Sequence, residues 1–303
     1  MEASRVTSSP VKQAHAPSGV RQLVADYVTL TKPRVQLLLL LTTVATMEIA
    51  GSPSLGLIVL TVVGGYLSAG GAGAVNHWYD RDIDGLMART ANRPIPSGRV
   101  SPRAALIYGF TLQVLSFALL SLTVNVLAAV FALLGFLGYV FVYTLWLKRT
   151  TPQNIVIGGA AGAVPPLVGW VATTGHFDPA SLYLFAIVFY WTPPHFWALS
   201  LRMKDEYAGV GVPMLPVVRG EEETRRQITL YSFLLVAVTF LPFAGRLFDG
   251  IYAIAAAILG AWFLWLAVRL QRSPSRGTAL KLYLFSMLYL ALLFAAMVVD
   301  VKL

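Results

Sequence analysis

NHWYDRDIDGLMARTANRPIPSGRV, residues 76–100, is the most polar stretch of an otherwise apolar chain. It carries three aspartates and four arginines, and it directly follows a run of small apolar residues, LSAGGAGAV, at 67–75. Charges of both signs gathered at the end of an apolar segment predict a polar site at the edge of a membrane.

The composition excludes a soluble protein. Of 303 residues, 57% are hydrophobic and 12% are charged, whereas soluble domains have about 25% charged residues. The absence of cysteine excludes disulfides, thiol nucleophiles and thiolate metal sites. The net charge of +9 is better explained by basic residues on one side of a membrane than by nucleic-acid binding, so we expect a lipid bilayer and no nucleic acid as partner.

Apolar segments of about 20 residues recur along the chain, and each is long enough to cross a hydrocarbon core of ~30 Å. They are too long and too continuously apolar for barrel strands, so they are expected to be helices. The fold class predicted is an all-α polytopic membrane protein with nine transmembrane helices. The predicted spans are 34–52, 55–76, 103–123, 125–146, 154–174, 180–201, 228–247, 250–270 and 280–299.

Basic residues give this bundle a direction. They precede the first span and fill the loops after spans two, four, six and eight, and only Arg246 and Lys302 fall on the other side. By the positive-inside rule the N-terminus is cytoplasmic and the C-terminus is outside. Residues 1–25 are polar and lack the apolar core of a signal peptide, which predicts a disordered cytoplasmic tail before a single membrane domain, 26–303.

Asn76, Asp80 and Asp84 are spaced i, i+4, i+8, which puts them on one stripe if the second span continues as a helix past the membrane surface. Like charges four apart on a helix repel unless a cation lies between them. Oxygen ligands of this kind suit Mg²⁺, which takes one or two carboxylates plus substrate phosphates. Asp82 points to the other side of the helix and is expected to be solvated.

Arg89 and Arg93 follow this stripe, and guanidinium groups bind phosphate oxygens bidentately. Metal-binding acids followed by arginines form a clamp for a diphosphate. The alternative is an ordinary basic loop with salt bridges, which accounts for the arginines but not for the stripe of acids.

The same loop resembles the signature of the UbiA superfamily of membrane prenyltransferases. The matching positions are Asn76, Asp80, Ile83, Asp84, Met87, Arg89, Thr90, Arg93 and Gly98. The resemblance implies a UbiA-like helix bundle, Mg²⁺ as cofactor, and catalytic roles for Asp80, Asp84, Arg89 and Arg93 in ionising a prenyl diphosphate.

Further stretches resemble the protohaem IX farnesyltransferase branch of that superfamily. They are YVTLTKPRV (27–35), KRTTPQNIVIGGAAGAVPPLVGW (148–170), WTPPHFWALSL (191–201) and KDEYAGVGVPMLPVV (204–218). The branch implies transfer of a farnesyl group from farnesyl diphosphate to a vinyl group of haem B, with addition of water, to give haem O. It also implies a place in the cell membrane and haem A synthase as a candidate partner.

Other site residues follow from the resemblance. Lys148 and Arg149 are expected to contact the diphosphate, although anchoring to the cytoplasmic surface explains them equally well. The second polar loop lacks the second DxxxD motif that many members carry, so Asp205 is expected as the nearest equivalent metal ligand, with Lys204 and Tyr207 binding substrate.

His195 lies within the sixth predicted span, behind Pro193 and Pro194. A polar residue at membrane depth is by default a functional residue, and imidazole is a natural ligand of haem iron, so we expect His195 to contact haem. The alternative is a histidine that hydrogen-bonds backbone carbonyls freed by the two prolines.

The sequence leaves two alternative functions open. Within the same class, the acceptor is a quinone precursor or another aromatic molecule. In a different class, the protein is an ion-coupled transporter or a haem carrier. Transporters place their coupling sites near the bilayer midplane, whereas these acids are expected at the cytoplasmic rim beside arginines, which favours diphosphate chemistry.

Overall fold

The computed structural model describes residues 19–303, and within them the fold is entirely helical with no β-strand. The helices are α1 (Val20–Leu30), α2 (Pro33–Ala50), α3 (Leu55–Tyr79), α4 (Arg81–Asp84), α5 (Pro102–Thr123), α6 (Val126–Leu137), the π-helix η1 (Gly138–Leu147), α7 (Lys148–Thr150), α8 (Asn154–Gly162), α9 (Val164–Thr174), α10 (Ser181–Arg202), α11 (Lys204–Gly209), α12 (Leu215–Val218), α13 (Gly220–Thr239), α14 (Leu241–Ala244), α15 (Gly250–Arg272) and α16 (Arg276–Lys302).

Eight helical segments of the described chain are long and apolar enough to cross a membrane. They correspond to eight of the nine predicted spans. The remaining prediction, 180–201, coincides with α10, which has 22 residues but is not among those eight. Helix α10 continues without a break through Pro193 and Pro194.

The predicted disordered tail needs a correction at its C-terminal end. Its residues 1–18 lie outside the described part of the chain, but residues 20–25 form the first turns of α1. This helix packs beside α3 and α5. The ring of Tyr27 meets that of Tyr108 edge-on at 4.9 Å, and Arg99 Nε lies 3.0 Å from both carboxylate oxygens of the buried Asp26.

Several long helices begin at a polar side chain that caps the free backbone N–H groups. The Ser101 hydroxyl accepts from the Ala104 N–H at 3.2 Å, directly before Pro102 starts α5. The Asn125 side chain accepts from the Ala128 N–H at 2.8 Å and starts α6. Hydrophobicity alone does not define where these helices begin, and the capping side chains fix their first residues.

Helices α3 and α5 approach each other through two glycines. A Cβ atom on Gly71 would lie 2.5 Å from the carbonyl oxygen of Gly109, and one on Gly109 would lie 2.8 Å from Val75. Small residues permit this close packing in membranes, where lipid offers no hydrophobic drive for helices to associate. The run of small residues before the polar stretch therefore fixes the helix that carries the acids.

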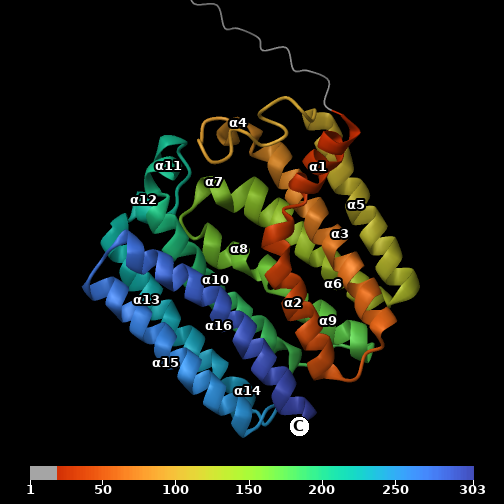
Figure 1. Ribbon diagram of the computed structural model, residues 1–303, viewed down its shortest axis with the longest axis vertical. Helices are drawn as coiled ribbons and strands as arrows, with labels where there is room; N and C mark the ends of the chain where they lie inside the picture. The colour runs from red at the N-terminus through yellow and green to blue at the C-terminus, as the bar shows by residue number, and fades with distance from the viewer. Residues whose placement is uncertain (1–18) are drawn as a thin grey trace, which may run out of the picture.

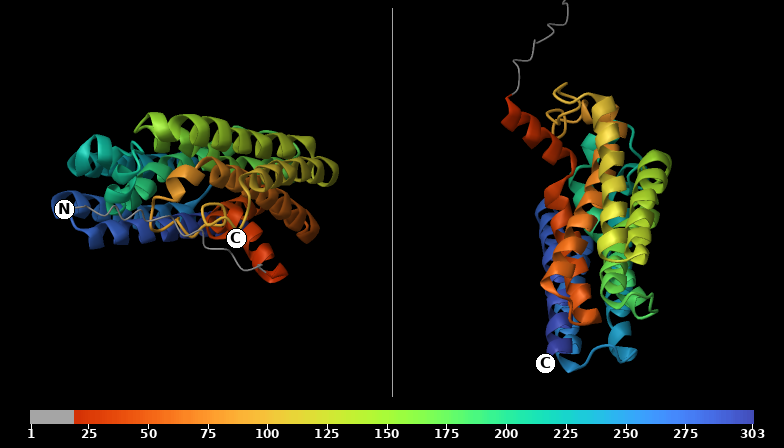
Figure 2. Two further views of the ribbon diagram at one scale, coloured as in Figure 1. Left: turned by 90° about the horizontal axis from the view of Figure 1, so that it is seen from above. Right: turned by 90° about the vertical axis from the view of Figure 1, so that its right-hand side faces the viewer.

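The bundle places all the loops that follow α3, η1 and α10 at one end. Figure 1 shows α4, α7 and α11 at the end where α1 lies, while the C-terminus lies at the opposite end. In the side view of Figure 2 the long helices run roughly along the same axis. Segments far apart in sequence, 76–93, 148–149 and 204–207, are thus brought to one end of the bundle.

Candidate active site

The stripe predicted from Asn76, Asp80 and Asp84 is present. The backbone N–H of Asp80 donates to the Asn76 carbonyl at 2.9 Å, and that of Asp84 donates to the Asp80 carbonyl at 2.8 Å, so the helical path continues past the end of α3. All three side chains are buried. The side chain of Asp82 is 60% exposed, as expected for the opposite side of the helix.

Each buried carboxylate has a cationic partner. Lys148 Nζ pairs with Asp80 Oδ2, and Arg93 Nη1 lies 2.7 Å from Asp84 Oδ2. Asn76 Nδ2 donates to Asp80 Oδ2 at 2.9 Å, which ties the first two members of the stripe together. Buried charges persist only when they are paired and hydrogen-bonded, so Lys148 and Arg93 are what allow two carboxylates to lie so close.

Lys32 is a site residue that sequence reasoning missed. It lies between α1 and α2 with a left-handed backbone (φ 54°), and its Nζ donates to Asn76 Oδ1 at 2.5 Å. Burial, with a further contribution from Arg93, lowers the pKa of Lys32 to about 8. The signal was the following Pro33, which starts α2 and turns Lys32 inward, whereas Arg34 is exposed.

A π-helix on the opposite wall was also missed. The η1 segment is wound more widely than an α-helix, and π-helical turns are frequent at functional sites. Thr144 accepts from Asn76 Nδ2 at 3.2 Å, and the Tyr139 hydroxyl lies 3.5 Å from Lys32 Nζ. Lys148 follows directly after η1, so Thr144 and Lys148 contact the stripe from this side, and Tyr139 contacts Lys32. Nothing in its apolar sequence marks it as a π-helix.

Arg149 is mainly engaged at the surface of the loop. Its guanidinium makes two 2.7 Å hydrogen bonds to Asp82 and lies over the ring of Tyr79 at 4.4 Å. Its hydrogen bonds lower the pKa of Asp82 to about 2. Arg149 also lies 3.5 Å from Asp80 Oδ1. The guanidinium of Arg149 therefore holds the loop through Asp82 and also contacts the stripe at Asp80, while Lys148 pairs directly with the other Asp80 oxygen.

The second polar loop reaches the site through residues other than the expected acid. Tyr207 is close enough to Arg89, Arg93 and Asp80 for their charges to act on it, although burial is the main reason why its pKa is raised. Glu206, which was not predicted, lies 4.0 Å from Arg89.

The metal role expected for Asp205 does not fit its position. The Asp205 side chain is 85% exposed and pairs with Arg276 at 3.5 Å. Lys204 pairs with Glu221 at 3.3 Å and likewise does not reach the stripe. The short helix α11 turns Tyr207 inward and these two side chains outward, which the sequence of the loop did not reveal.

His195 is part of a separate cluster between α10 and α16. Its ring stacks on Trp191 at 4.3 Å and on Tyr283 at 4.7 Å, and its Nδ1 lies 2.6 Å from the hydroxyl of Ser286. The hydrogen-bond partner of Nδ1 is thus a side chain of α16 and not a carbonyl freed by the prolines. Within the described part of the chain Nε2 has no hydrogen-bond partner, and it is not among the fully enclosed atoms.

Comparison with known proteins identifies the family. The sequence profile of the UbiA prenyltransferase family matches residues 37–293, most of the chain. The chain belongs to the UbiA prenyltransferase family. The resemblance noted in the sequence is thereby confirmed.

Relatives within the UbiA family are named protoheme IX farnesyltransferase. That of Chloroflexus aurantiacus is 54% identical over 96% of this chain and 51% of its own length. That of Deinococcus radiodurans is 50% identical over 97% of this chain and 98% of its own length. The chain thus spans about half the length of the Chloroflexus relative and nearly all of the Deinococcus one.

Solved UbiA structures share the fold. A digeranylgeranylglyceryl phosphate synthase structure has a TM-score of 0.77 at 21% identity, covering 93% of this chain and all of that one. A UbiA homologue from Archaeoglobus fulgidus bound to DMAPP and Mg²⁺ has a TM-score of 0.68 at 18% identity, covering 90% of this chain and 99% of that one. At these identities the likeness establishes the fold alone.

The stripe of this UbiA member fits a magnesium ion shared with a substrate. The described residues contain no group of three or more His, Cys, Asp or Glu side chains able to enclose a metal by themselves. Asp80 Oδ1 is buried and accepts no hydrogen bond, and its only cationic neighbour within the described chain is Arg149 at 3.5 Å, so this oxygen can also ligate a metal ion. Two carboxylates completed by phosphate oxygens are the usual donor set of Mg²⁺ at phosphate sites, so Asp80 and Asp84 suit it.

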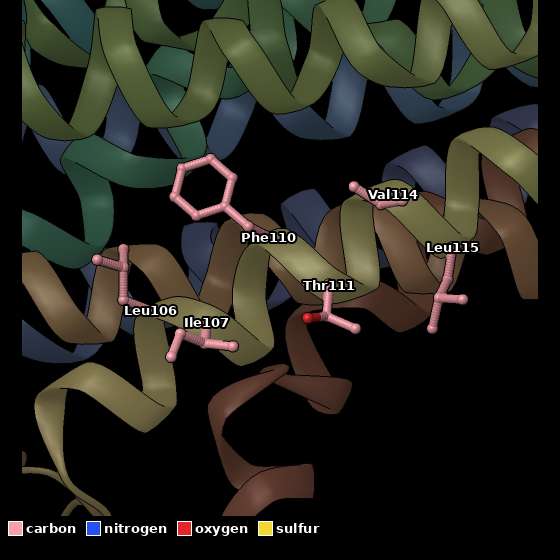
Figure 3. A pocket seen from close by; sticks show the side chains of 6 residues that line it. All are labelled: Leu106, Ile107, Phe110, Thr111, Val114 and Leu115. Carbon is pink, nitrogen blue, oxygen red and sulfur yellow. The ribbon is translucent and has the colours of Figure 1, made fainter.

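A surface hollow on α5 lies away from the stripe. A shallow hollow of about 450 Å³ is lined by side chains of α5 alone, and Figure 3 shows Phe110 and Val114 along its length. Five of its six lining residues are apolar, and Ile107 and Val114 are both two-thirds exposed. Exposed apolar side chains on one face of a membrane helix are what a lipid-facing surface requires, so this hollow is no candidate for the chemistry.

Proposed function

We propose that this UbiA member transfers the farnesyl group of farnesyl diphosphate to a vinyl group of haem B, with addition of water, giving haem O and diphosphate. Transfer of a prenyl group is supported by one observation. Asp80 and Asp84 are buried at one end of the apolar helices, and they pair with Lys148 and Arg93. The haem acceptor is supported by the name that relatives 50–54% identical to this chain bear.

The residues of the stripe divide the work of ionising the prenyl diphosphate. Asp80 and Asp84 would hold Mg²⁺, which when bound neutralises charge on the diphosphate. Lys148 and Arg93 contact these carboxylates and Lys32 contacts Asn76 beside them, so the three cations are already in position to stabilise the charge that develops on the phosphate oxygens. Preorganised cations stabilise such developing charge without the cost of reorienting water. Arg89, half exposed beside Glu206, is placed at the outer edge of the clamp.

The acceptor half of the reaction adds two bonds. A vinyl carbon of haem forms a bond to C1 of the farnesyl cation, and the new cation beside the pyrrole takes the oxygen of one water, which releases a proton. Apolar walls must exclude water from the first cation, whose premature capture gives farnesol. Tyr207, half-buried in α11 of the second polar loop, is proposed to close the site on its cytoplasmic side.

His195 is proposed to contact the haem. It lies within α10 among Trp191 and Tyr283, rings that suit a flat macrocycle, and its Nε2 is without a partner in the described chain. The depth of this cluster suits an apolar ring system, whereas the diphosphate belongs with Lys32, Lys148 and Arg93 at the rim.

The test is an incubation of the full chain in detergent with haem B, farnesyl diphosphate and Mg²⁺. The expected product has the mass of haem plus one farnesyl group and one hydroxyl group. Parallel reactions with an aromatic acid as acceptor examine the rival activity. A product from the aromatic acid and none from haem would replace the proposed acceptor while leaving prenyl transfer intact.

We further propose nine spans, with α10 as the sixth, the N-terminus in the cytoplasm and the C-terminus outside, in the cell membrane. At 1.5 Å per residue the 22 residues of α10 extend about 33 Å, enough to cross a bilayer. Because the chain has no cysteine, single cysteines report topology directly. A thiol reagent confined to the outside should label Arg246→Cys but not Ser273→Cys.

Haem A synthase is the proposed recipient of the product, which stays in the membrane.

A further inference from the structure

A small basic pocket lies at the cytoplasmic end of α10, α13 and α16, apart from the stripe of acids. Its volume is about 100 Å³. Three arginines and one glutamate supply its charges, namely Arg202, Arg225, Arg276 and Glu221. Ser275, the N-cap of α16, also lines it, so the positive end of a 27-residue helix points the same way.

The positive charge of this pocket is not neutralised from within the described chain. Glu221 is already shared by two cations, Lys204 at 3.3 Å and Arg225 at 3.6 Å. Arg202 has no carboxylate within ion-pair distance among residues 19–303, although it ends α10 directly at the pocket. Arg276 pairs only with the exposed Asp205, and water screens such a contact strongly.

The size of the pocket restricts what enters it. One water occupies about 30 Å³ of liquid, so this space holds one small acidic group but neither a prenyl chain nor a macrocycle. Guanidinium groups are the side chains best suited to carboxylate and phosphate oxygens. The occupant is therefore the acidic end of a larger molecule whose body lies in the membrane.

The pocket lies in register with the His195 cluster. Arg202 follows His195 by seven residues on α10, and Ala279, which lines the pocket, precedes Ser286 by seven residues on α16. Residues seven apart lie on the same face of a helix, two turns and about 10 Å along the axis. The pocket thus lies about 10 Å nearer the cytoplasm than the His195–Ser286 contact, along the same seam between α10 and α16.

We infer that this pocket binds the carboxylate or phosphate of a membrane-borne amphiphile through Arg202 and Arg225. Two sources supply that chemistry. One is a haem propionate, which rests on the proposed function and on His195 as the haem residue. The other is the phosphate of an anionic phospholipid, which does not depend on the proposed function.

Haem and its dimethyl ester, which has no free carboxylate, separate the two sources. Both are titrated optically into the full chain in phosphatidylcholine nanodiscs, with Arg202→Gln, Arg225→Gln and the control Arg272→Gln. Arg272 is an exposed arginine at the end of α15 that does not line the pocket. If propionates are bound, Arg202→Gln weakens haem binding about tenfold, the effect of losing one charge-assisted hydrogen bond. Binding of the ester is unchanged.

A second measurement uses native mass spectrometry after incubation with phosphatidylglycerol. Retention of this lipid by the wild type and by Arg272→Gln, but not by Arg202→Gln or Arg225→Gln, assigns the pocket to lipid phosphate. The inference is overturned if neither haem carboxylates nor phosphatidylglycerol distinguish the pocket variants from Arg272→Gln. Failure to form any haem product alongside arginine-dependent lipid retention would sink the proposed function and leave the pocket standing.

Discussion

The hydroxyl of Ser286 contacts Nδ1 of His195 at 2.6 Å and donates its only proton to the backbone carbonyl of Tyr283, also at 2.6 Å. When the Ser286 hydroxyl donates to this carbonyl it can only accept from the ring, and Nδ1 of a neutral His195 is then the protonated nitrogen. The lone pair then lies on Nε2, the nitrogen without a partner. A partner on one ring nitrogen commonly fixes the tautomer of a functional histidine in this way.

Ser286→Ala should therefore weaken haem binding without unfolding the bundle. Loss of such an outer partner typically costs 10- to 100-fold in affinity, so we expect a loss of about tenfold in an optical haem titration. Ser286→Thr, which keeps the hydroxyl, is the matched control. Imidazole ¹⁵N spectra, assigned with His195→Gln, should show an unprotonated Nε2 in the wild type and a mixture of tautomers in Ser286→Ala.

His195→Ala tests whether the cluster around His195 binds haem or the prenyl diphosphate. It should reduce haem affinity or shift the haem absorption spectrum, with little change in the binding of radiolabelled farnesyl diphosphate. The reverse pattern would move His195 to the diphosphate. No change in either would leave it as a packing residue between Trp191 and Tyr283.

Asp80→Asn and Asp84→Asn should each lower turnover by on the order of 100-fold or more, because each removes a ligand of the cation that stabilises the leaving group. Asp82→Asn is the matched control, since it changes a carboxylate on the same helical turn whose side chain is 60% exposed. Turnover in detergent at saturating Mg²⁺ is the measurement. Near-normal turnover in the double variant Asp80→Asn/Asp84→Asn would remove the metal assignment.

Local regularities of the sequence were enough for much of the fold. Apolar length predicts helices because lipid leaves the backbone no other way to satisfy its hydrogen bonds, and eight predicted spans coincide with long apolar helices. The spacing of Asn76, Asp80 and Asp84 required only that the helix continue. It does so with Asp80 closing α3 by a hydrogen bond back to Asn76.

Apolar length and residue spacing do not predict contacts between segments that are far apart in the sequence. Lys32 reaches Asn76 across 44 residues, and its inward direction depends on a single left-handed backbone position. The outward orientation of Asp205 depends on how the short helix α11 begins at Met203. A sequence pattern specifies which face of one helix a residue occupies, but the angle of a short connecting helix is set by tertiary packing.

Arg93→Lys should weaken the handling of diphosphate although it keeps the charge. Arg93 places one guanidinium nitrogen 2.7 Å from Asp84, and its remaining donors are free for phosphate oxygens in a geometry that the single ammonium of lysine lacks. Inhibition by inorganic diphosphate should weaken about tenfold. Arg89→Lys, at a half-exposed position 4.0 Å from Glu206, should change it much less. Equal effects of the two variants would reduce Arg93 to a determinant of topology.

The lowered pKa of Lys32 predicts a pH dependence of diphosphate binding. Burial moves this pKa from 10.5 to about 8, so the ammonium is present below pH 8 and is lost as the pH rises through that value. The folded state favours the neutral amine, which means that Lys32 itself does not stabilise the fold at low pH. What it contributes while charged is attraction for phosphate oxygens, and this attraction should fade above pH 8.

Lys32→Arg supplies the comparison, because a guanidinium stays charged over the whole range. Binding of inorganic diphosphate with Mg²⁺ is measured by calorimetry from below to above pH 8 for both proteins. The ligand titrates identically in the two series, so the ratio of their affinities isolates Lys32. We expect the wild type to lose affinity relative to Lys32→Arg above pH 8. A constant ratio would mean that Lys32 holds Asn76 in place and does not act on the diphosphate.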